Sequence, residues 1–204
     1  MKESITQFFL ASSSPRRKEL LQQIGVKFKV LVIDVDESIY SGESAETYVE
    51  RVALKKARAG KSNLAMDNCV VLAADTAVLI DGNILGKPSN KDHALAMLQS
   101  LSGKTHKVIT SLAIMGDNKT CHRTCTTEVS FKLLNEIECE LYWQTGEPRD
   151  KAGAYGIQGK GAVFVESITG SYSNVVGLPL KETAELLEYF KVPFWLNDSE
   201  PSVI

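Results

Sequence analysis

Short apolar runs alternate with amphipathic segments along most of the chain. Runs rich in Val, Leu, Ile and Phe are typical of buried strands, whereas apolar residues three or four positions apart are typical of helices that bury one face. The apolar runs predict strands at residues 7–10, 27–35, 69–74, 77–80, 106–115, 120–133 and 163–166. The amphipathic segments predict helices at residues 15–25, 44–59, 90–101, 135–146 and 180–190. Strands and helices mixed in this order predict an α/β fold around one sheet.

Composition narrows the class of protein. The 204 residues include 23 Lys and Arg against 25 Asp and Glu, a formal net charge of −2. Such a balanced chain does not coat nucleic acid through bulk charge, so anion binding must depend on where individual basic residues lie. No apolar stretch approaches the roughly 18 residues of a membrane span, and the first residues lack a signal-peptide core. Four scattered cysteines are too few for a disulfide framework, so we expect a reduced, cytoplasmic protein.

Residues 12–18, Ser-Ser-Ser-Pro-Arg-Arg-Lys, form the most informative motif. Ser14 precedes Pro15 in the pattern of a helix N-terminus, where unpaired N–H groups already carry partial positive charge. Cations in the first turn are unfavourable there unless an anion completes the arrangement. The Ser12 and Ser14 hydroxyls with Arg16 and Arg17 therefore predict a phosphate-binding site. The alternative is a solvated basic helix start.

Lys56 lies on the apolar stripe of the helix predicted at 44–59. It follows Val52 by four residues and Val49 by seven, so helical phase places it on the inward face and turns Lys55 away. A lysine on a buried face must either extend its amine to solvent or meet an anion. The neighbouring basic motif favours the anion.

Two acidic positions could act beside such an anion. Asp75 interrupts the apolar runs 70–74 and 77–80, where a lone carboxylate is costly without a cation, a metal or a hydrogen-bond network. It is either a satisfied structural aspartate or a metal ligand and general base. The acidic pair Asp36-Glu37 follows a predicted strand and could supply a second metal ligand, or it could be an ordinary polar loop.

A glycine-dense segment and an isolated lysine add candidates for ligand binding. Residues 156–161 do not match the spacing of the dinucleotide fingerprint. Their glycines instead allow the backbone to approach a ligand closely, and Gln158 offers an amide that can pair with a base edge. Lys87 follows a predicted hairpin and is ambiguous alone.

Together these residues resemble the Maf family of nucleoside triphosphate pyrophosphatases. The matching motifs are Leu10–Arg17, Asp36–Glu37, Lys55–Ala57, Ala74–Thr76, Gly86–Pro88, Leu101–Gly103, Asp150–Gly159 and Asn174–Leu180. The resemblance implies an inosine triphosphatase-like α/β architecture: a twisted mixed sheet in an elongated, two-lobed molecule with a central nucleotide cleft. Residues 1–192 would form this single catalytic domain, and residues 193–204 a loosely ordered tail.

The resemblance also implies a reaction and its residues. Members of the family hydrolyse a nucleoside triphosphate to the monophosphate and pyrophosphate with a divalent cation, Mg²⁺ or Mn²⁺. Asp75 would be the proton acceptor and would share the metal with Glu37. The phosphates would be held by hydroxyl and basic side chains, namely Ser12, Ser14, Arg16, Arg17, Lys56 and Lys87.

Substrate choice and assembly follow from the same resemblance. The combination of Arg16, Thr76 and Gln158 is similar to the branch that acts on dTTP and UTP, and family members are commonly homodimers. Two other functions are left open. The family name is tied to inhibition of septum formation, so the protein could be a nucleotide-binding regulator of cell division. It could also be a purine-selective enzyme that removes noncanonical nucleotides.

Overall fold

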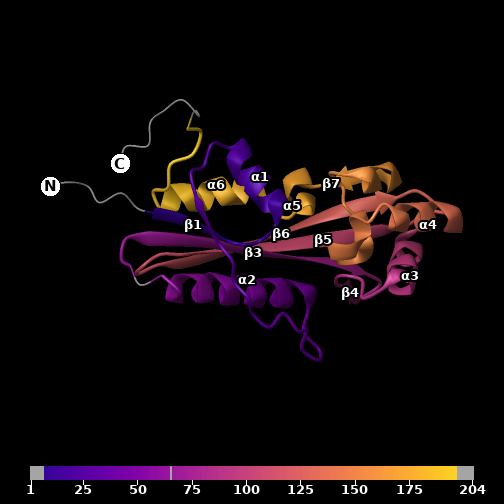
Figure 1. The fold of residues 1–204 in the computed structure, drawn as a ribbon, viewed down its shortest axis with the longest axis horizontal. Coiled ribbons are helices and arrows are strands. Elements are labelled where there is room, and N and C mark those ends of the chain that lie inside the picture. Colours follow the sequence, from indigo (N-terminus) through magenta and orange to yellow (C-terminus); the bar gives the residue numbers. More distant parts are fainter. Residues whose placement is uncertain (1–6, 65, 197–204) are drawn as a thin grey trace. The chain divides into compact units, whose positions relative to one another are not determined.

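The structure is a computed structural model that describes residues 7–64 and 66–196 (Figure 1). Its strands are β1 (Gln7–Ala11), β2 (Lys29–Leu31), β3 (Cys69–Ile80), β4 (Asn83–Leu85), β5 (Thr105–Met115), β6 (Thr120–Phe131) and β7 (Val165–Thr169). Its α-helices are α1 (Pro15–Gln23), α2 (Ala45–Ser62), α3 (Lys91–Leu101), α4 (Glu136–Gln144), α5 (Tyr172–Val176) and α6 (Leu180–Tyr189). Three short 3₁₀ turns are η1 (Glu147–Asp150), η2 (Ala152–Ala154) and η3 (Lys160–Phe164).

The strands form one sheet of mixed direction. Their order is β2-β1-β3-β5-β6-β7, and β4 pairs with β3 beside this path. Strand β1 runs parallel to both β2 and β3, whereas β3–β4 and β6–β7 are antiparallel pairs. The predicted α/β class with a mixed sheet is therefore confirmed.

The chain divides into two compact units. Unit 1 takes the described parts of residues 1–75, 111–124 and 177–204, and unit 2 takes residues 76–110 and 125–176. Strands β3, β5 and β6 contribute residues to both, and the division on β3 falls between Asp75 and Thr76.

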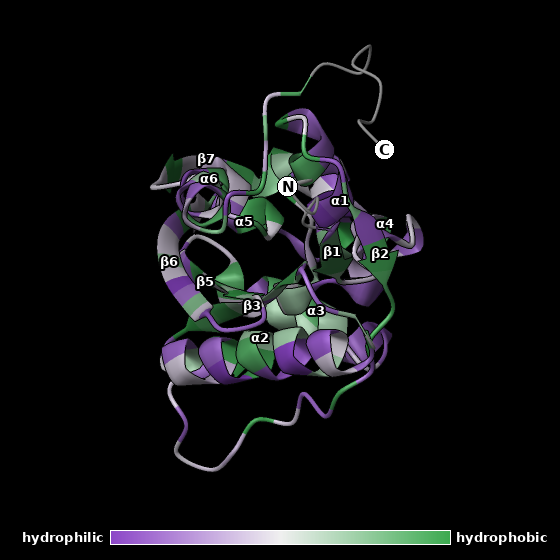
Figure 2. Cartoon of the chain, turned by 90° about the vertical axis from the view of Figure 1, so that its left-hand side faces the viewer, coloured by the Kyte–Doolittle hydropathy of each residue, from purple (hydrophilic) through white to green (hydrophobic). Residues whose placement is uncertain are grey.

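Unit 1 packs helices on both faces of its strands. Helix α2 lies on one side of β3, and α1 and α6 lie on the other (Figures 1 and 2). Small side chains line the contact with α2, because Ala53 and Ala57 pack in one buried cluster with Ala11 and Val71. A Cβ atom on Gly60 would lie 2.9 Å from a methyl carbon of Val71, so glycine permits the close approach.

Several predicted boundaries were wrong. The strand expected at 27–35 is confined to β2, because it pairs with β1 over three residues only and Val32 beyond it is 80% exposed. Helix α2 continues through Gly60, which serves helix–sheet packing and does not end the helix. The strand expected at 163–166 begins at Val165, because the turn η3 occupies the residues before it.

The segment after Val192 is partly paired. The backbone N–H groups of Trp195 and Leu196 donate to the carbonyl oxygens of Ile24 and Gly25, at N–O distances of 2.7 and 3.3 Å. The remainder of the predicted tail, residues 197–204, lies outside the described residues.

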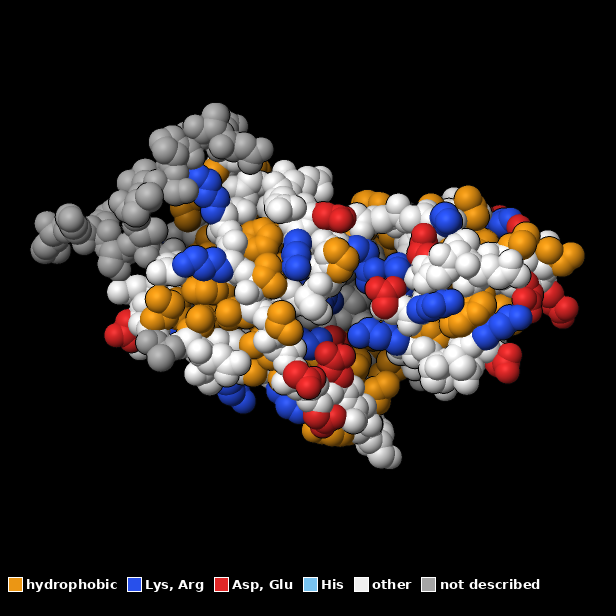
Figure 3. Space-filling view, viewed as in Figure 1, with side chains coloured by type: hydrophobic (Ala, Val, Ile, Leu, Met, Phe, Trp, Pro, Cys, Tyr) orange, Lys and Arg blue, Asp and Glu red, His pale blue; other side chains and the backbone are white. Residues whose placement is uncertain are grey.

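The surface carries both charge signs. Basic and acidic side chains are interspersed on the face drawn in Figure 3, in keeping with the balanced composition. Within residues 7–64 and 66–196, no helix has both the length and the apolar character needed to cross a membrane.

Candidate active site

Asp75 is a buried carboxylate in the middle of β3. The strand is apolar on both sides of it, and Asp75 itself is 6% exposed. An ionised carboxylate in such a position requires a compensating positive charge. That charge is supplied from helix α2.

Lys56 bridges two carboxylates. Its Nζ lies 2.7 Å from Asp75 Oδ1 and 2.7 Å from Glu37 Oε1. Lys56 is 9% exposed, so the prediction from helical phase that it faces inward is confirmed. The anions that it meets in the structure are these two carboxylates, and its contact with phosphate stays a prediction. The neighbouring Lys55 instead donates to the carbonyl oxygen of Asp36 at 3.0 Å, which holds the segment carrying Glu37 against α2.

Arg17 brings a second cation to this group. Its Nη1 donates to Ser12 Oγ at 3.3 Å, and its Nε donates to the carbonyl oxygen of Gly177 at 2.8 Å. Burial lowers the pKa of Arg17, and the positive charge of Arg16 lowers it further. The negative charges of Asp75 and Glu37 act in the opposite direction. Unit 1 thus gathers Ser12 and the two arginines with the acidic residues.

The pKa of Asp75 is raised above its ordinary value. Burial is the largest cause, and the charge of Glu37 adds to it, whereas Lys56 and Arg17 pull the pKa down. The carboxylate is therefore a stronger base than an exposed aspartate. This combination of burial and specific charge partners is typical of functional sites.

The start of α1 follows the prediction in position but not in contact. Ser14 is the N-cap residue, yet its side chain makes no capping hydrogen bond. Its backbone N–H donates to Ser12 Oγ at 3.2 Å instead. No acidic residue lies in the first turn of α1, so the partial positive charge of this helix end is not balanced there from within the helix.

Arg51 is a residue that the sequence reasoning missed. It forms a two-pronged ion pair with Glu43, with N–O distances of 2.6 and 2.7 Å, and donates to the carbonyl oxygen of Ser38 at 2.8 Å. Its guanidinium carbon lies 3.8 Å from the centre of the Tyr40 ring. Arg51 thereby fastens segment 38–43, which follows Glu37, to helix α2. The signal for this role in the sequence is weak, because it consists of one aromatic and one acidic residue, Tyr40 and Glu43, in an irregular segment.

Tyr48 of α2 lies four residues before Val52 and one turn of the helix from the buried stripe. Burial raises the pKa of its hydroxyl, and the negative charges of Asp75 and Glu37 raise it further. The phenol therefore stays protonated close to the acidic pair. Its spacing in α2 was the correct signal for an inward position, but spacing does not reveal a polar neighbour.

The remaining predicted site residues belong to unit 2. Thr76 Oγ1 is 2.9 Å from Thr110 Oγ1, which donates to the carbonyl oxygen of Asn174 at 3.0 Å. Lys87 is exposed after β4, and Gln158 is exposed within the glycine-dense segment.

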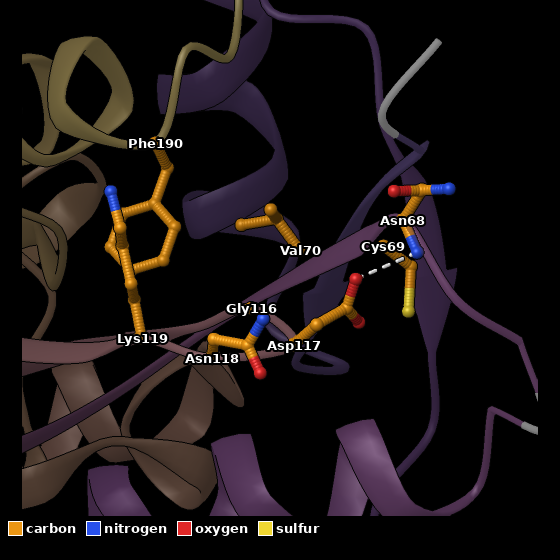
Figure 4. A pocket seen from close by; sticks show the side chains of 8 residues that line it. All are labelled: Asn68, Cys69, Val70, Gly116, Asp117, Asn118, Lys119 and Phe190. Carbon is orange, nitrogen blue, oxygen red and sulfur yellow. Dashed lines mark hydrogen bonds between the residues drawn. The ribbon is translucent and has the colours of Figure 1, made fainter. Parts of the chain in front are cut away.

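A separate pocket in unit 1 contains none of the predicted site residues (Figure 4). It is lined by residues 68–70, 116–119 and Phe190. Asp117 accepts hydrogen bonds from the backbone of Asn68 at 2.8 Å and from Lys61 Nζ at 2.5 Å. The first bond fixes the start of β3, and the second fixes the end of α2, to the turn between β5 and β6, so a structural role accounts for these polar groups.

Glu37 and Asp75 are the candidate metal ligands. Among the described residues, no group of three or more His, Cys, Asp and Glu side chains could hold a metal ion. Mg²⁺, however, commonly uses one or two carboxylates and completes its shell with substrate phosphates and water. Two carboxylates around Lys56 fit that mode of binding, and they do not form an all-protein cage.

Comparison with known sequences places the chain in a family. The Maf-like protein family matches residues 7–190, a range that contains every site residue named above. The chain belongs to the Maf family.

Three Maf relatives cover nearly the whole chain, and each is named dTTP/UTP pyrophosphatase. The protein of Aromatoleum aromaticum is 48% identical over 95% of this chain and 100% of its own length. Those of Alkalilimnicola ehrlichii and Saccharophagus degradans are each 50% identical, over 91% and 93% of this chain and 94% and 91% of their own lengths. These names describe hydrolases and do not favour a regulator of septum formation.

The ion pair at the centre of this Maf site generates a first prediction. We expect Lys56→Met to raise the pKa of Asp75 further, because the variant loses the largest positive contribution opposing burial. NMR titration of the Asp75 carboxyl measures the change. Because the pKa of Asp75 is higher in the folded protein than in the unfolded chain, the free energy of unfolding falls as the pH rises from the unfolded-state pKa to the folded-state pKa. In the variant this fall should continue to a higher pH.

Arg58→Met is the matched control for this titration. It removes an exposed cation from the same helix and leaves the contacts of Glu37, Lys56 and Asp75 in place, so the pKa of Asp75 should stay as in the unaltered protein. An Asp75 pKa that stays constant or decreases in Lys56→Met would show that the ion pair does not govern this carboxyl.

The contacts of Arg51 generate a second prediction. The N–H of Tyr40 donates to Glu43 Oε2, and the N–H of Glu43 donates to the carbonyl oxygen of Tyr40. Because Arg51 holds the Glu43 carboxylate, we expect Arg51→Met to increase hydrogen exchange at both amides. Mass spectrometry of peptides covering 38–44 measures the change. Arg58→Met, at an exposed position of α2, is the control. Unchanged exchange in Arg51→Met would contradict the role assigned to the ion pair.

Proposed function

We propose that this protein is a dTTP/UTP pyrophosphatase. The observation that carries the proposal is the buried Asp75 carboxylate, paired with Lys56 and close to Glu37 and Arg17, in a chain half identical to relatives of that name. Hydrolysis of a phosphoanhydride needs a base for water and cations for the phosphates. Both kinds of group meet in unit 1.

Asp75 acts as the proton acceptor in this proposal. An attacking water forms the new bond to the α-phosphorus and gives its proton to an Asp75 carboxylate oxygen. The bond from the α-phosphorus to the oxygen bridging to the β-phosphate breaks, and pyrophosphate leaves with that electron pair. The raised pKa supports this role, because a carboxylate with a higher pKa accepts a proton more readily.

The basic residues bind and orient the triphosphate. Ser12 and Ser14 precede α1, and Arg16 and Arg17 lie in its first turn, where unpaired N–H groups and positive charge favour phosphate oxygens. Their contribution is positioning and charge neutralisation, which are the main requirements of phosphoryl transfer. Lys56 and Lys87 complete the proposed phosphate ligands.

Glu37 and Asp75 would hold a divalent cation, Mg²⁺ or Mn²⁺. When bound, such an ion neutralises phosphate charge and polarises the scissile bond. The Lys56 ammonium contacts both carboxylates, so the Glu37 and Asp75 oxygens lie close together. Carboxylate oxygens are hard ligands that suit both Mg²⁺ and Mn²⁺.

Three residues are proposed to select the substrate. Arg16 precedes Arg17 in the first turn of α1, and Thr76 directly follows the proposed base. Gln158 carries a side-chain amide on an exposed turn, and an amide offers both a donor and an acceptor to the O4 and N3–H of uracil or thymine.

The setting of the enzyme is also proposed. No disulfide joins the four cysteines of the described residues, Cys69, Cys121, Cys125 and Cys139, which supports a reducing compartment such as the cytoplasm. The expectation of a homodimer rests on family resemblance, and sedimentation velocity on the full chain tests it.

The proposed reaction generates a third prediction. Asp75→Asn should lower kcat for pyrophosphate release from dTTP and UTP by about 10²- to 10⁴-fold, the usual contribution of a general base. Asparagine keeps the size of the side chain but cannot accept the proton of water. Pyrophosphate release in the presence of Mg²⁺ measures the rate.

Asp34→Asn is the control, because Asp34 is an exposed acid near Glu37. It should leave kcat within about two-fold of the unaltered enzyme, as expected for a surface change away from the site. Full turnover by Asp75→Asn would exclude Asp75 as the base. Absence of pyrophosphate release by the unaltered protein would exclude the proposed function itself.

A further inference from the structure

Glu147, at the start of η1, is the centre of a hydrogen-bond network in unit 2. Its Oε1 accepts from Tyr142 Oη at 2.7 Å and from the backbone of Gly161 at 3.1 Å. Its Oε2 accepts from the backbone of Lys160 at 2.9 Å. Tyr142 Oη in turn accepts from the backbone of Gly156 at 3.0 Å. One carboxylate and one phenol therefore satisfy three backbone N–H groups of segment 156–161.

The glycines of this segment are explained by the same contacts. A Cβ atom on Gly159 would lie 2.3 Å from Glu147 Oε2, and one on Gly161 would lie 2.6 Å from Tyr142 Oη. Any larger residue would displace the backbone from the carboxylate. The sequence predicts that these glycines let the backbone approach a ligand. In the structure they let it approach the side chains of Glu147 and Tyr142, and the approach to a ligand stays a prediction.

Glu147 is held in its charged form. Burial acts to raise its pKa, but the hydrogen bonds from Lys160, Tyr142 and Gly161 and the charge of Lys151 outweigh burial, so the pKa is lowered. Hydrogen bonds to an ionised acceptor are about twice as strong as neutral ones. The charge on Glu147 thus strengthens the attachment of the segment.

Gln158 is presented by this network. The backbone of Gly159 donates to the carbonyl oxygen of Gly156 at 3.2 Å, which closes a turn around residues 157 and 158. Ile157 is buried while Gln158 is exposed, so the turn anchors one side chain and displays the other. Amide hydrogen bonds are directional, so the pairing of Gln158 with a base depends on the orientation of this turn.

We propose that Glu147 is a positioning residue for substrate selection: it holds the turn that orients Gln158 toward the imide edge of uracil or thymine. This inference rests on the proposed function. Cytosine presents an amino donor where uracil presents the O4 acceptor, so a fixed amide discriminates between UTP and CTP. A turn released from Glu147 would lose that discrimination, while the groups of unit 1 would keep their chemistry.

The first measurement is independent of substrate. Glu147→Gln places an amide group where Oε1 and Oε2 accept three hydrogen bonds, so hydrogen exchange should increase in peptides covering 156–162. Tyr142→Phe removes one hydroxyl and should produce a smaller increase. Glu166→Gln, which alters an exposed carboxylate on β7, should produce none. Unchanged exchange in Glu147→Gln would overturn the proposal.

The second measurement is kinetic. We expect Glu147→Gln to raise KM for UTP and dTTP about 10-fold and to leave kcat within about three-fold of the unaltered enzyme. The ratio of kcat/KM for UTP to kcat/KM for CTP should fall about 10-fold. A change of this size corresponds to the loss of one well-formed hydrogen bond. A merely structural defect would lower activity on UTP and CTP alike. Equal losses on both substrates would overturn the proposal.

A double variant tests whether Glu147 acts through Gln158. Gln158→Leu alone should lower the UTP-to-CTP ratio, and adding Glu147→Gln should change that ratio no further. Additive losses would assign to Glu147 an effect separate from Gln158 and would overturn the proposal. Failure of the unaltered enzyme to hydrolyse dTTP or UTP would instead refute the proposed function, and the exchange experiment would still decide whether Glu147 holds the turn.

Discussion

The ion pair between Lys56 and Asp75 joins the most buried strand of unit 1 to its longest helix. An aspartate in an apolar strand is costly unless a cation reaches it, and Lys56 reaches it at 2.7 Å from the inward face of α2. The contact requires α2 to pack closely on the sheet, which the alanines at 53 and 57 and the glycine at 60 permit. The small side chains of this helix therefore serve two ends at once: they allow close packing on the sheet, and that packing brings the Lys56 ammonium to the Asp75 carboxylate.

Carboxylates organise the irregular segments of both units. Glu43 joins Arg51 to the segment that follows Glu37, and Glu147 joins η1 to the glycine-dense turn. Loops cannot satisfy their backbone groups through regular ladders, so side chains must do so. A charged acceptor does this with stronger hydrogen bonds than a neutral one. The same device thus fixes the surroundings of a proposed catalytic group and of a proposed selective one.

Sequence patterns predicted the regular elements and the inward lysine because periodicity records burial directly. Lys56 shares the phase of Val49 and Val52, and its neighbourhood is buried as that phase requires. The pattern overestimated the length of β2, because apolar residues at the edge of a sheet, such as Val32, can remain exposed. Arg51 and Glu147 could not be found from periodicity, since their partners lie in irregular segments whose path depends on tertiary contacts. Their hydrogen bonds become visible only in three dimensions.

The distribution of charge explains how a nearly neutral chain can still suit a highly charged substrate. The cations of unit 1 are partly compensated before any ligand binds, because Lys56 meets two carboxylates and Arg17 lies near the same acids. Compensation of this kind limits the cost of burying them. A triphosphate brings several negative charges at once, and only a cluster of partly buried cations can offset them at short range. Local arrangement therefore matters more than net charge, and the two acids that stabilise the cations are also the groups suited to hold a divalent ion.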